Sequence, residues 1–257
     1  MLIVDKIKEH RNNVPKELEG IDELDSTTKD YMLYKFLKDN LNDYPYLLEE
    51  LPVYFMEEIL INEINSYNFE RYFTDNVIKK LNEGTGKLRR ILLNHIEYAN
   101  LIPKLTTEKN YMPSSIYFNN EEKWVSISKY LALFQSRYGK KELISFLNSF
   151  NDRNSCENLF KEMEDSDFFY NALFDDDDII ELVKGNFGKN LNNDSFSKLI
   201  SKMSSLDNPN KYMNLLLDNN IYDRCKKDIS VSYLTRLLFE KDVSLISDIN
   251  INNLSNM

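Results

Sequence analysis

Apolar residues recur at intervals of three and four along almost the whole chain, a spacing typical of amphipathic helices. The sequence has only six glycines and six prolines in 257 residues, and it lacks alternating strand patterns joined by hairpin dipeptides. We therefore predict an all-α fold, an irregular multi-helix bundle or a helical array. A period of about 20–50 residues is missing, so a regular solenoid is not expected, while irregular helical repeats remain open.

The expected helices form one core with an extension. Ser26-Thr27-Thr28 can cap a helix that runs through Leu41, and Pro52 suits the first turn of the next helix. Further helices are expected over 74–84, from Thr85 through Ala99, over 122–139 and 140–150, two or three times within 157–185 and three times after Gly188, with a long loop at 103–121. Residues 1–190 are predicted to form an acidic α-helical domain, and residues 191–257 a C-terminal helical extension packed on the same core.

Several classes of protein are not expected. Asp5 and Lys6 place charge too early for the apolar core of a signal peptide, and no apolar run approaches the roughly 18 residues that span a bilayer. Cys156 and Cys225 lack the spacing of a zinc site, which favours two reduced thiols. We therefore expect a cytoplasmic protein without a membrane segment.

Charge is concentrated in one stretch. Residues 157–181 contain ten acids and one base, a sum of −9 against −10 for the whole chain. Because Phe160, Phe168, Phe169 and Phe174 lie between these acids, the charge is expected on a folded surface and not on a disordered tail. An acidic surface repels nucleic acid, so direct nucleic-acid binding is not expected, and a basic protein is the natural partner.

The predicted partner-binding residues come from this stretch: Glu162, Glu164, Asp165, Asp167, Asp175, Asp176, Asp177 and Asp178. The last four acids are consecutive and precede Ile179, whereas a calcium loop alternates its ligands, has a glycine at its sixth position and ends in a bidentate glutamate. Capping of a helix N-terminus with a solvated acidic face is the favoured interpretation. We expect no metal and no cofactor.

A catalytic alternative rests on Arg90 and His95, which match the Arg-x4-His pattern of HEPN-type ribonucleases. His95 also lies in register with Leu88 and Leu92, which favours a core histidine. His10 is the one other histidine, and no complete phosphate-binding loop is present, so an enzyme is the less favoured interpretation. Residues 79–141 hold twelve bases and five acids, which fits a solvated face, a nucleic-acid groove using Tyr98 or Trp124, or a contact with the acidic stretch.

One segment resembles a known family. Residues 63–75 are similar to the signature E-x-N-N-G-G-F-x-Q-Y/F-F-x-N of small acidic bacterial proteins that include a DNA mimic; the matches are Glu63, Asn65, Phe69, Tyr72 and Phe73. Asp75 replaces the last Asn, and Ser66, Tyr67 and Asn68 replace Asn-Gly-Gly, although Asn68 tolerates left-handed geometry. The resemblance covers about residues 45–190 and implies a helical fold whose carboxylates stand in for duplex phosphates. Without it, the same segment is explained as an amphipathic helix and its turn packed in the core.

The favoured function is therefore a non-catalytic, acidic protein-binding module or inhibitor. Its partner would be a basic protein, and as a DNA mimic it would occupy a nucleic-acid-binding protein. The HEPN ribonuclease and an interaction protein of a phage or defence system remain as alternatives.

Overall fold

The computed structural model describes residues 2–106, 112–118, 123–166, 168–171, 174–203, 209–216 and 218–225. Almost all regular structure in these residues is helical, so the prediction of an all-α, multi-helix fold is confirmed. The chain divides into two compact units, residues 1–126 and residues 127–257. The predicted boundary at residue 190 lies inside the second unit, and the extension over residues 191–257 stays a prediction.

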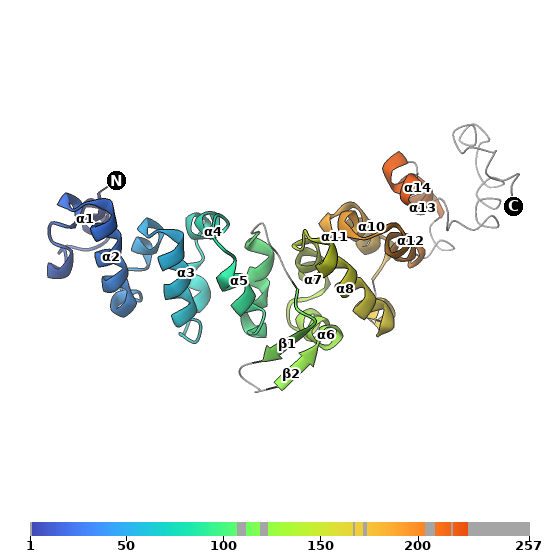
Figure 1. Ribbon diagram of the computed structural model, residues 1–257, viewed down its shortest axis with the longest axis horizontal. Helices are drawn as coiled ribbons and strands as arrows, with labels where there is room; N and C mark the ends of the chain where they lie inside the picture. The colour runs from blue at the N-terminus through green and yellow to red at the C-terminus, as the bar shows by residue number, and fades with distance from the viewer. Residues whose placement is uncertain are drawn as a thin grey trace, which may run out of the picture. The chain divides into compact units, whose positions relative to one another are not determined.

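The first unit is a series of short helices. Its elements are α1 (Ile3–His10), η1 (Lys16–Leu18), η2 (Ile21–Glu23), α2 (Ser26–Asn40), η3 (Pro45–Glu50), α3 (Val53–Asn62), η4 (Phe69–Tyr72), α4 (Asp75–Leu81), α5 (Lys87–Leu92) and η5 (Ile96–Lys104), where η marks a 3₁₀ helix. Helix α2 packs on α3, and α3 packs on α4 and α5, so these helices lie side by side in chain order (Figure 1). Neighbours along the sequence therefore build this core, as expected for a helical array.

Capping residues explain several helix starts and correct two predictions. The carboxylate of Asp25, and not Ser26-Thr27-Thr28, caps α2 by accepting a hydrogen bond from the Thr28 amide at 3.1 Å. Pro52 is the residue before α3 and not part of its first turn. Helix α4 begins at the predicted place. Thr74 caps it, because the Thr74 hydroxyl oxygen accepts a hydrogen bond from the Val77 amide.

The helix expected from Thr85 through Ala99 is broken. α5 ends at Leu92, and η5 begins at Ile96 after His95 leaves helical backbone angles. Asparagine and histidine are weaker helix formers than leucine, and the helix is interrupted at Asn94 and His95. Leu88, Leu92, His95 and Ala99 are nevertheless all buried, so the predicted apolar face is present without one continuous helix.

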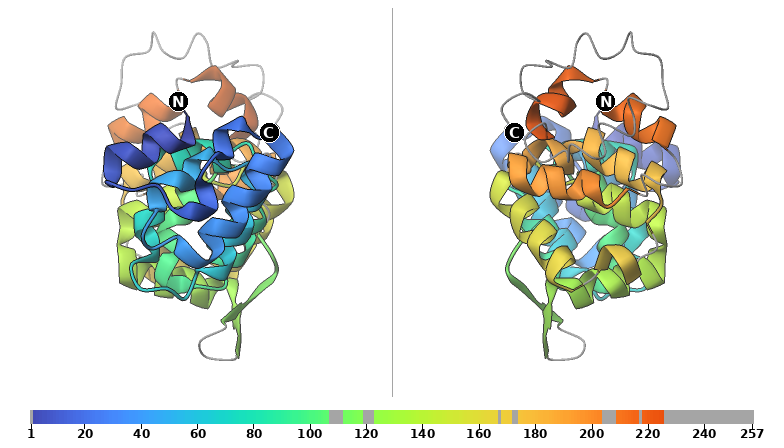
Figure 2. Two further views of the ribbon diagram at one scale, coloured as in Figure 1. Left: turned by 90° about the vertical axis from the view of Figure 1, so that its left-hand side faces the viewer. Right: turned by 90° about the vertical axis from the view of Figure 1, so that its right-hand side faces the viewer.

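A small β-hairpin replaces part of the expected loop and helix. β1 (Ser115–Phe118) pairs antiparallel with β2 (Lys123–Ser126), opposing Ile116 to Val125 and Tyr117 to Trp124 (Figure 2). Ile116, Phe118 and Val125 are buried, whereas Trp124 is 69% exposed. Aromatic and β-branched residues favour strands, and each of these strands is too short to show a clear spacing of apolar residues.

The second unit is wholly helical in its described residues. Its elements are α6 (Ile127–Tyr138), α7 (Lys140–Asn148), α8 (Arg153–Asp165), α9 (Phe168–Asn171), α10 (Asp176–Lys184), α11 (Asn186–Asn190), α12 (Asn193–Ser201), α13 (Pro209–Leu216) and α14 (Asn219–Cys225). Helix α10 packs against α7, α11 and α12. The helices expected within the acidic stretch, and two of the three after Gly188, those with Leu199 and with Leu215, are thus present. The third, expected to contain Leu234, Leu237 and Leu238, lies outside the described residues.

A close approach of backbone and side chain links α7 to the α10–α11 corner. The Asn148 side-chain oxygen accepts a hydrogen bond from the Phe187 amide at 3.2 Å. A Cβ atom added to Gly185 would lie 2.0 Å from that oxygen, far inside contact distance. A side chain at residue 185 would therefore displace the Asn148 side chain from its hydrogen bond to Phe187.

Candidate protein-binding surface

Helix α8 presents three of the predicted binding residues. Asp152 caps its start by accepting from the Ser155 amide at 2.8 Å, and the inner face buries Leu159, Phe160 and Met163. The opposite face is therefore left to polar residues. On it Asp165 is exposed, and Glu162 and Glu164 are half-buried.

The four consecutive acids open α10 as the sequence predicted. The Asp175 carboxylate accepts from the amides of Asp177 and Asp178 at 3.0 and 3.1 Å, and the Asp178 carboxylate accepts from the Asp175 amide at 2.8 Å. This reciprocal pair is a capping box, which satisfies amides that the helix cannot. The Asp178 amide, with a smaller contribution from Lys140, lowers the pKa of Asp175.

Lysines from three other helices bind these acids. Lys140 of α7 contacts Asp175 at 3.0 Å and Asp178 at 2.5 Å. Lys211 of α13 contacts Asp177 at 2.6 Å. On α8, Glu164 is contacted by Lys198 of α12 at 3.7 Å and by Lys202, the residue after α12, at 3.6 Å. The acidic surface is thus partly neutralised by the second unit itself. Lys140 belongs to the basic segment 79–141, so one of the contacts considered for that segment is present.

The predicted residues do not form one continuous set of contacts. Asp175 and Asp178 are joined directly, whereas the acids of α8 and those of α10 bind different lysines on different helices. Asp167 lies outside the described residues. We define the acidic surface as the described members: Glu162, Glu164, Asp165, Asp175, Asp176, Asp177 and Asp178.

Glu157, counted among the surface acids in the charge argument, has a structural role. Its carboxylate accepts hydrogen bonds from the backbone and side-chain amides of Asn192, the latter at 2.7 Å, and from the Ser195 hydroxyl at 2.8 Å. It therefore ties α8 to the start of α12 and satisfies groups there. Composition alone could not separate this acid from its neighbours, because the difference lies in a contact 35 residues away.

The described residues offer little support for the other chemistries considered. Among them, no group of three or more His, Cys, Asp or Glu side chains could hold a metal ion. None of the helices assigned to them has the length and apolar character needed to cross a bilayer. His95 is 3% exposed and its Nδ1 lies 3.3 Å from Glu97, while Arg90 is exposed on α5. This burial favours the core interpretation of His95.

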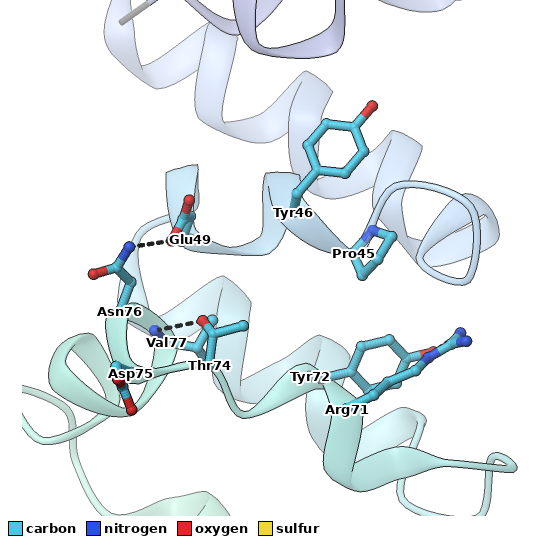
Figure 3. Close-up of a pocket in the computed structure, with 9 residues that line it drawn as sticks. All are labelled: Pro45, Tyr46, Glu49, Arg71, Tyr72, Thr74, Asp75, Asn76 and Val77. Atoms are coloured by element: carbon cyan, nitrogen blue, oxygen red, sulfur yellow. Dashed lines mark hydrogen bonds between the residues drawn. The ribbon is translucent and has the colours of Figure 1, made fainter. Parts of the chain in front are cut away.

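A pocket that the sequence analysis missed lies in the first unit. It has a volume of about 520 Å³ and is lined by Pro45, Tyr46, Glu49, Arg71, Tyr72, Thr74, Asp75, Asn76 and Val77 (Figure 3). Its walls come from η3 on one side and from η4 and the start of α4 on the other. No periodicity could reveal it, because η3 and η4 are separated along the chain by all of α3.

The segment 63–75 supplies part of this pocket. Asn68 has a φ of 62°, the one positive value among the non-glycine residues described, so it makes the turn in place of a glycine. Ile64, Phe69 and Tyr72 are buried, as the core interpretation of the segment predicts.

No protein-family model, curated protein or solved structure matches the chain. The resemblance to the DNA-mimic family therefore stays a prediction. The acidic surface and the pocket are the features of the chain that bear on its function.

Proposed function

We propose that the chain is a non-catalytic binding module whose acidic surface associates with a basic protein. The observation behind this proposal is the capping box, which fixes the direction of Asp175 and Asp178 at the start of α10. Fixed side chains lose less conformational entropy when a partner binds, which favours recognition. Asp175 and Asp177 also remain 63% and 73% exposed, so a partner can reach them.

The internal lysines do not prevent such an association. The side chains of Lys140, Lys198, Lys202 and Lys211 are 34–50% exposed. Exposed ion pairs of this kind stabilise a fold by only about 0–1 kcal/mol, so a partner's arginine or lysine can replace them at little cost. The same pairing weighs against the narrower form of the proposal, DNA mimicry, which needs carboxylates as available as duplex phosphates.

A variant that removes charge without disturbing the capping box tests this function. We combine Glu162→Gln, Asp165→Asn, Asp176→Asn and Asp177→Asn. The matched control removes four exposed acids of the first unit, by Glu17→Gln, Glu19→Gln, Glu23→Gln and Asp39→Asn. The wild-type chain and the control should retain one basic protein from a bacterial lysate at low salt, and the combined variant should lose it at least tenfold. Charge pairs act mainly on encounter, so retention by the wild type should fall as salt increases.

The contrary results are equally defined. A partner held equally by the combined variant would remove the acidic surface from the interaction. Equal loss in the first-unit control would show a general effect of net charge. Near-identical circular dichroism spectra of the three proteins are required, since a misfolded variant would also lose its partner.

A further inference from the structure

Arg71 lies at the pocket of the first unit and has no carboxylate partner in the described part of the chain. Its Nη2 donates to the side-chain oxygen of Asn42 and, at 3.0 Å, to the Tyr72 hydroxyl, and both acceptors are neutral. Its guanidinium also stacks on the Tyr72 ring, 4.9 Å from the centroid.

These contacts hold the guanidinium in place without neutralising it. Tyr72 is 1% exposed, and its hydroxyl donates to the same Asn42 oxygen at 2.8 Å, so the support is itself fixed. The N–H groups on Nε and Nη1 of Arg71 take no part in these contacts. A positioned guanidinium with spare donors is suited to a carboxylate, to which it forms strong, charge-assisted hydrogen bonds.

The rest of the pocket adds apolar lining. Pro45 and Tyr46 of η3 line one side, and Val77 of α4, which is 2% exposed, lies beside Asp75 at the far end (Figure 3). The Tyr46 ring stacks on the His10 ring at 4.0 Å and 11°. The volume of about 520 Å³ falls within the range of about 300–1,000 Å³ common for small-ligand sites. The pocket thus combines one cation with an apolar surface.

The two acids of the pocket do not cancel this cation. Glu49 binds Lys6, which it shares with Glu50, and accepts from the Asn76 side chain at 2.8 Å, so its charge is partly compensated. Asp75 lies at the opposite end of the pocket from Arg71 (Figure 3). A ligand can therefore place a carboxylate at Arg71 without meeting an uncompensated acid there.

We propose that this pocket binds a carboxylate joined to an apolar or aromatic body, as at the carboxyl end of a peptide. Arg71 holds the carboxylate, and Pro45 and Tyr46 of η3 contact the body. The site is independent of the acidic surface and has the opposite preference for charge. Because a net charge of −10 repels anions from the general surface, binding of an anion has to come from a local site of this kind.

Ligand-observed NMR on the full chain with N-acetylphenylalanine as the probe tests the proposal. A ligand of this size should bind with a Kd of about 1 mM. The probe's C-terminal amide, which lacks the carboxylate, should bind at least tenfold more weakly. Phenyl phosphate distinguishes carboxylate from phosphate recognition, and tighter binding of this compound would overturn the assignment.

Variants place the binding at Arg71. Arg71→Gln should weaken binding of N-acetylphenylalanine about tenfold, because a charge-assisted contact is lost. Arg71→Lys keeps the charge without the planar fork and should lie between the two. Arg90→Gln, an exposed arginine outside the pocket, should bind as the wild type does. Unchanged binding in Arg71→Gln, or equal binding of the amide, would overturn the proposal; thermal melting checks that each variant is folded.

Discussion

Asp22 shows how one carboxylate can hold together the start of the first unit. It accepts hydrogen bonds from the amides of Ile3 and Val4, at 3.0 and 2.9 Å, and from Lys29 at 2.6 Å. Leu2, the residue before α1, has no side chain that can cap the helix, so Asp22 satisfies these amides from η2. Its side chain is only 11% exposed, which makes these contacts effective.

The pH dependence of this residue follows from its environment. Burial raises the pKa of Asp22, but the hydrogen bonds from Lys29, Val4 and Ile3 together outweigh it and lower the pKa below the ordinary value. A carboxylate whose pKa is lower in the folded state stabilises the fold above its unfolded pKa of about 3.9, and this contribution is lost as pH falls through the folded pKa.

We therefore expect Asp22→Asn to lower the free energy of unfolding by about 1–3 kcal/mol at pH 7. The difference from the wild type should shrink as pH falls below about 4, where the carboxylate becomes protonated in the unfolded chain while it is still ionised in the folded chain. Urea denaturation followed by circular dichroism at several pH values measures it. Asp39→Asn, an exposed acid of α2, is the control, and a difference that does not change with pH would contradict the argument.

At the scale of the element, the α10–α11 corner gives the sharpest stability prediction. Gly185→Ala places a methyl group against the Asn148 side chain, and overpacking of this kind costs about 1–3 kcal/mol. Thermal unfolding measures this loss. Asn148→Ala removes both the obstacle and the hydrogen bond to Phe187, so in the double variant the two losses should not add. Strict additivity would show that the two residues do not interact.

Helices with strong apolar spacing and clear caps were predictable, and the hairpin was not. The limits of α10 follow from Asp175 and Gly185, which are neighbours of the helix in sequence. The strands have four residues each, and Trp124 fits the spacing of the helix that begins at Ile127. Pairing between the two strands stabilises such a segment, and the spacing of residues within one strand does not reveal that pairing.

The acids of the acidic surface were easier to predict from the sequence than the lysines that pair with them or the pocket of the first unit. The acids of α10 were found because their charge and their capping role are both local properties of sequence. The lysines that bind them come from α7 and α13, and the pocket at Arg71 combines η3 with η4, so both depend on tertiary contacts. Charge composition therefore indicated where acids are, but not which of them are already occupied.

At the scale of the whole molecule, the division at Ser126 and Ile127 predicts two unfolding events. Each unit has its own buried apolar residues, and separate cores commonly unfold separately. Calorimetry of the full chain should resolve two transitions. Gly185→Ala should lower the temperature of one, and Asp22→Asn that of the other. A single transition shifted by both variants would show that the units unfold together.

The lysines bound to the acidic surface have a consequence for the thermodynamics of any association there. A carboxylate that already contacts Lys140 or Lys211 has few loosely held cations to give up. When a partner's base replaces such a lysine, one ammonium exchanges for another, and little counterion is released to solution. The slope of the logarithm of the association constant against the logarithm of salt concentration then counts only the carboxylates that were not yet paired. That slope would measure how much of the acidity was still uncompensated before the partner arrived.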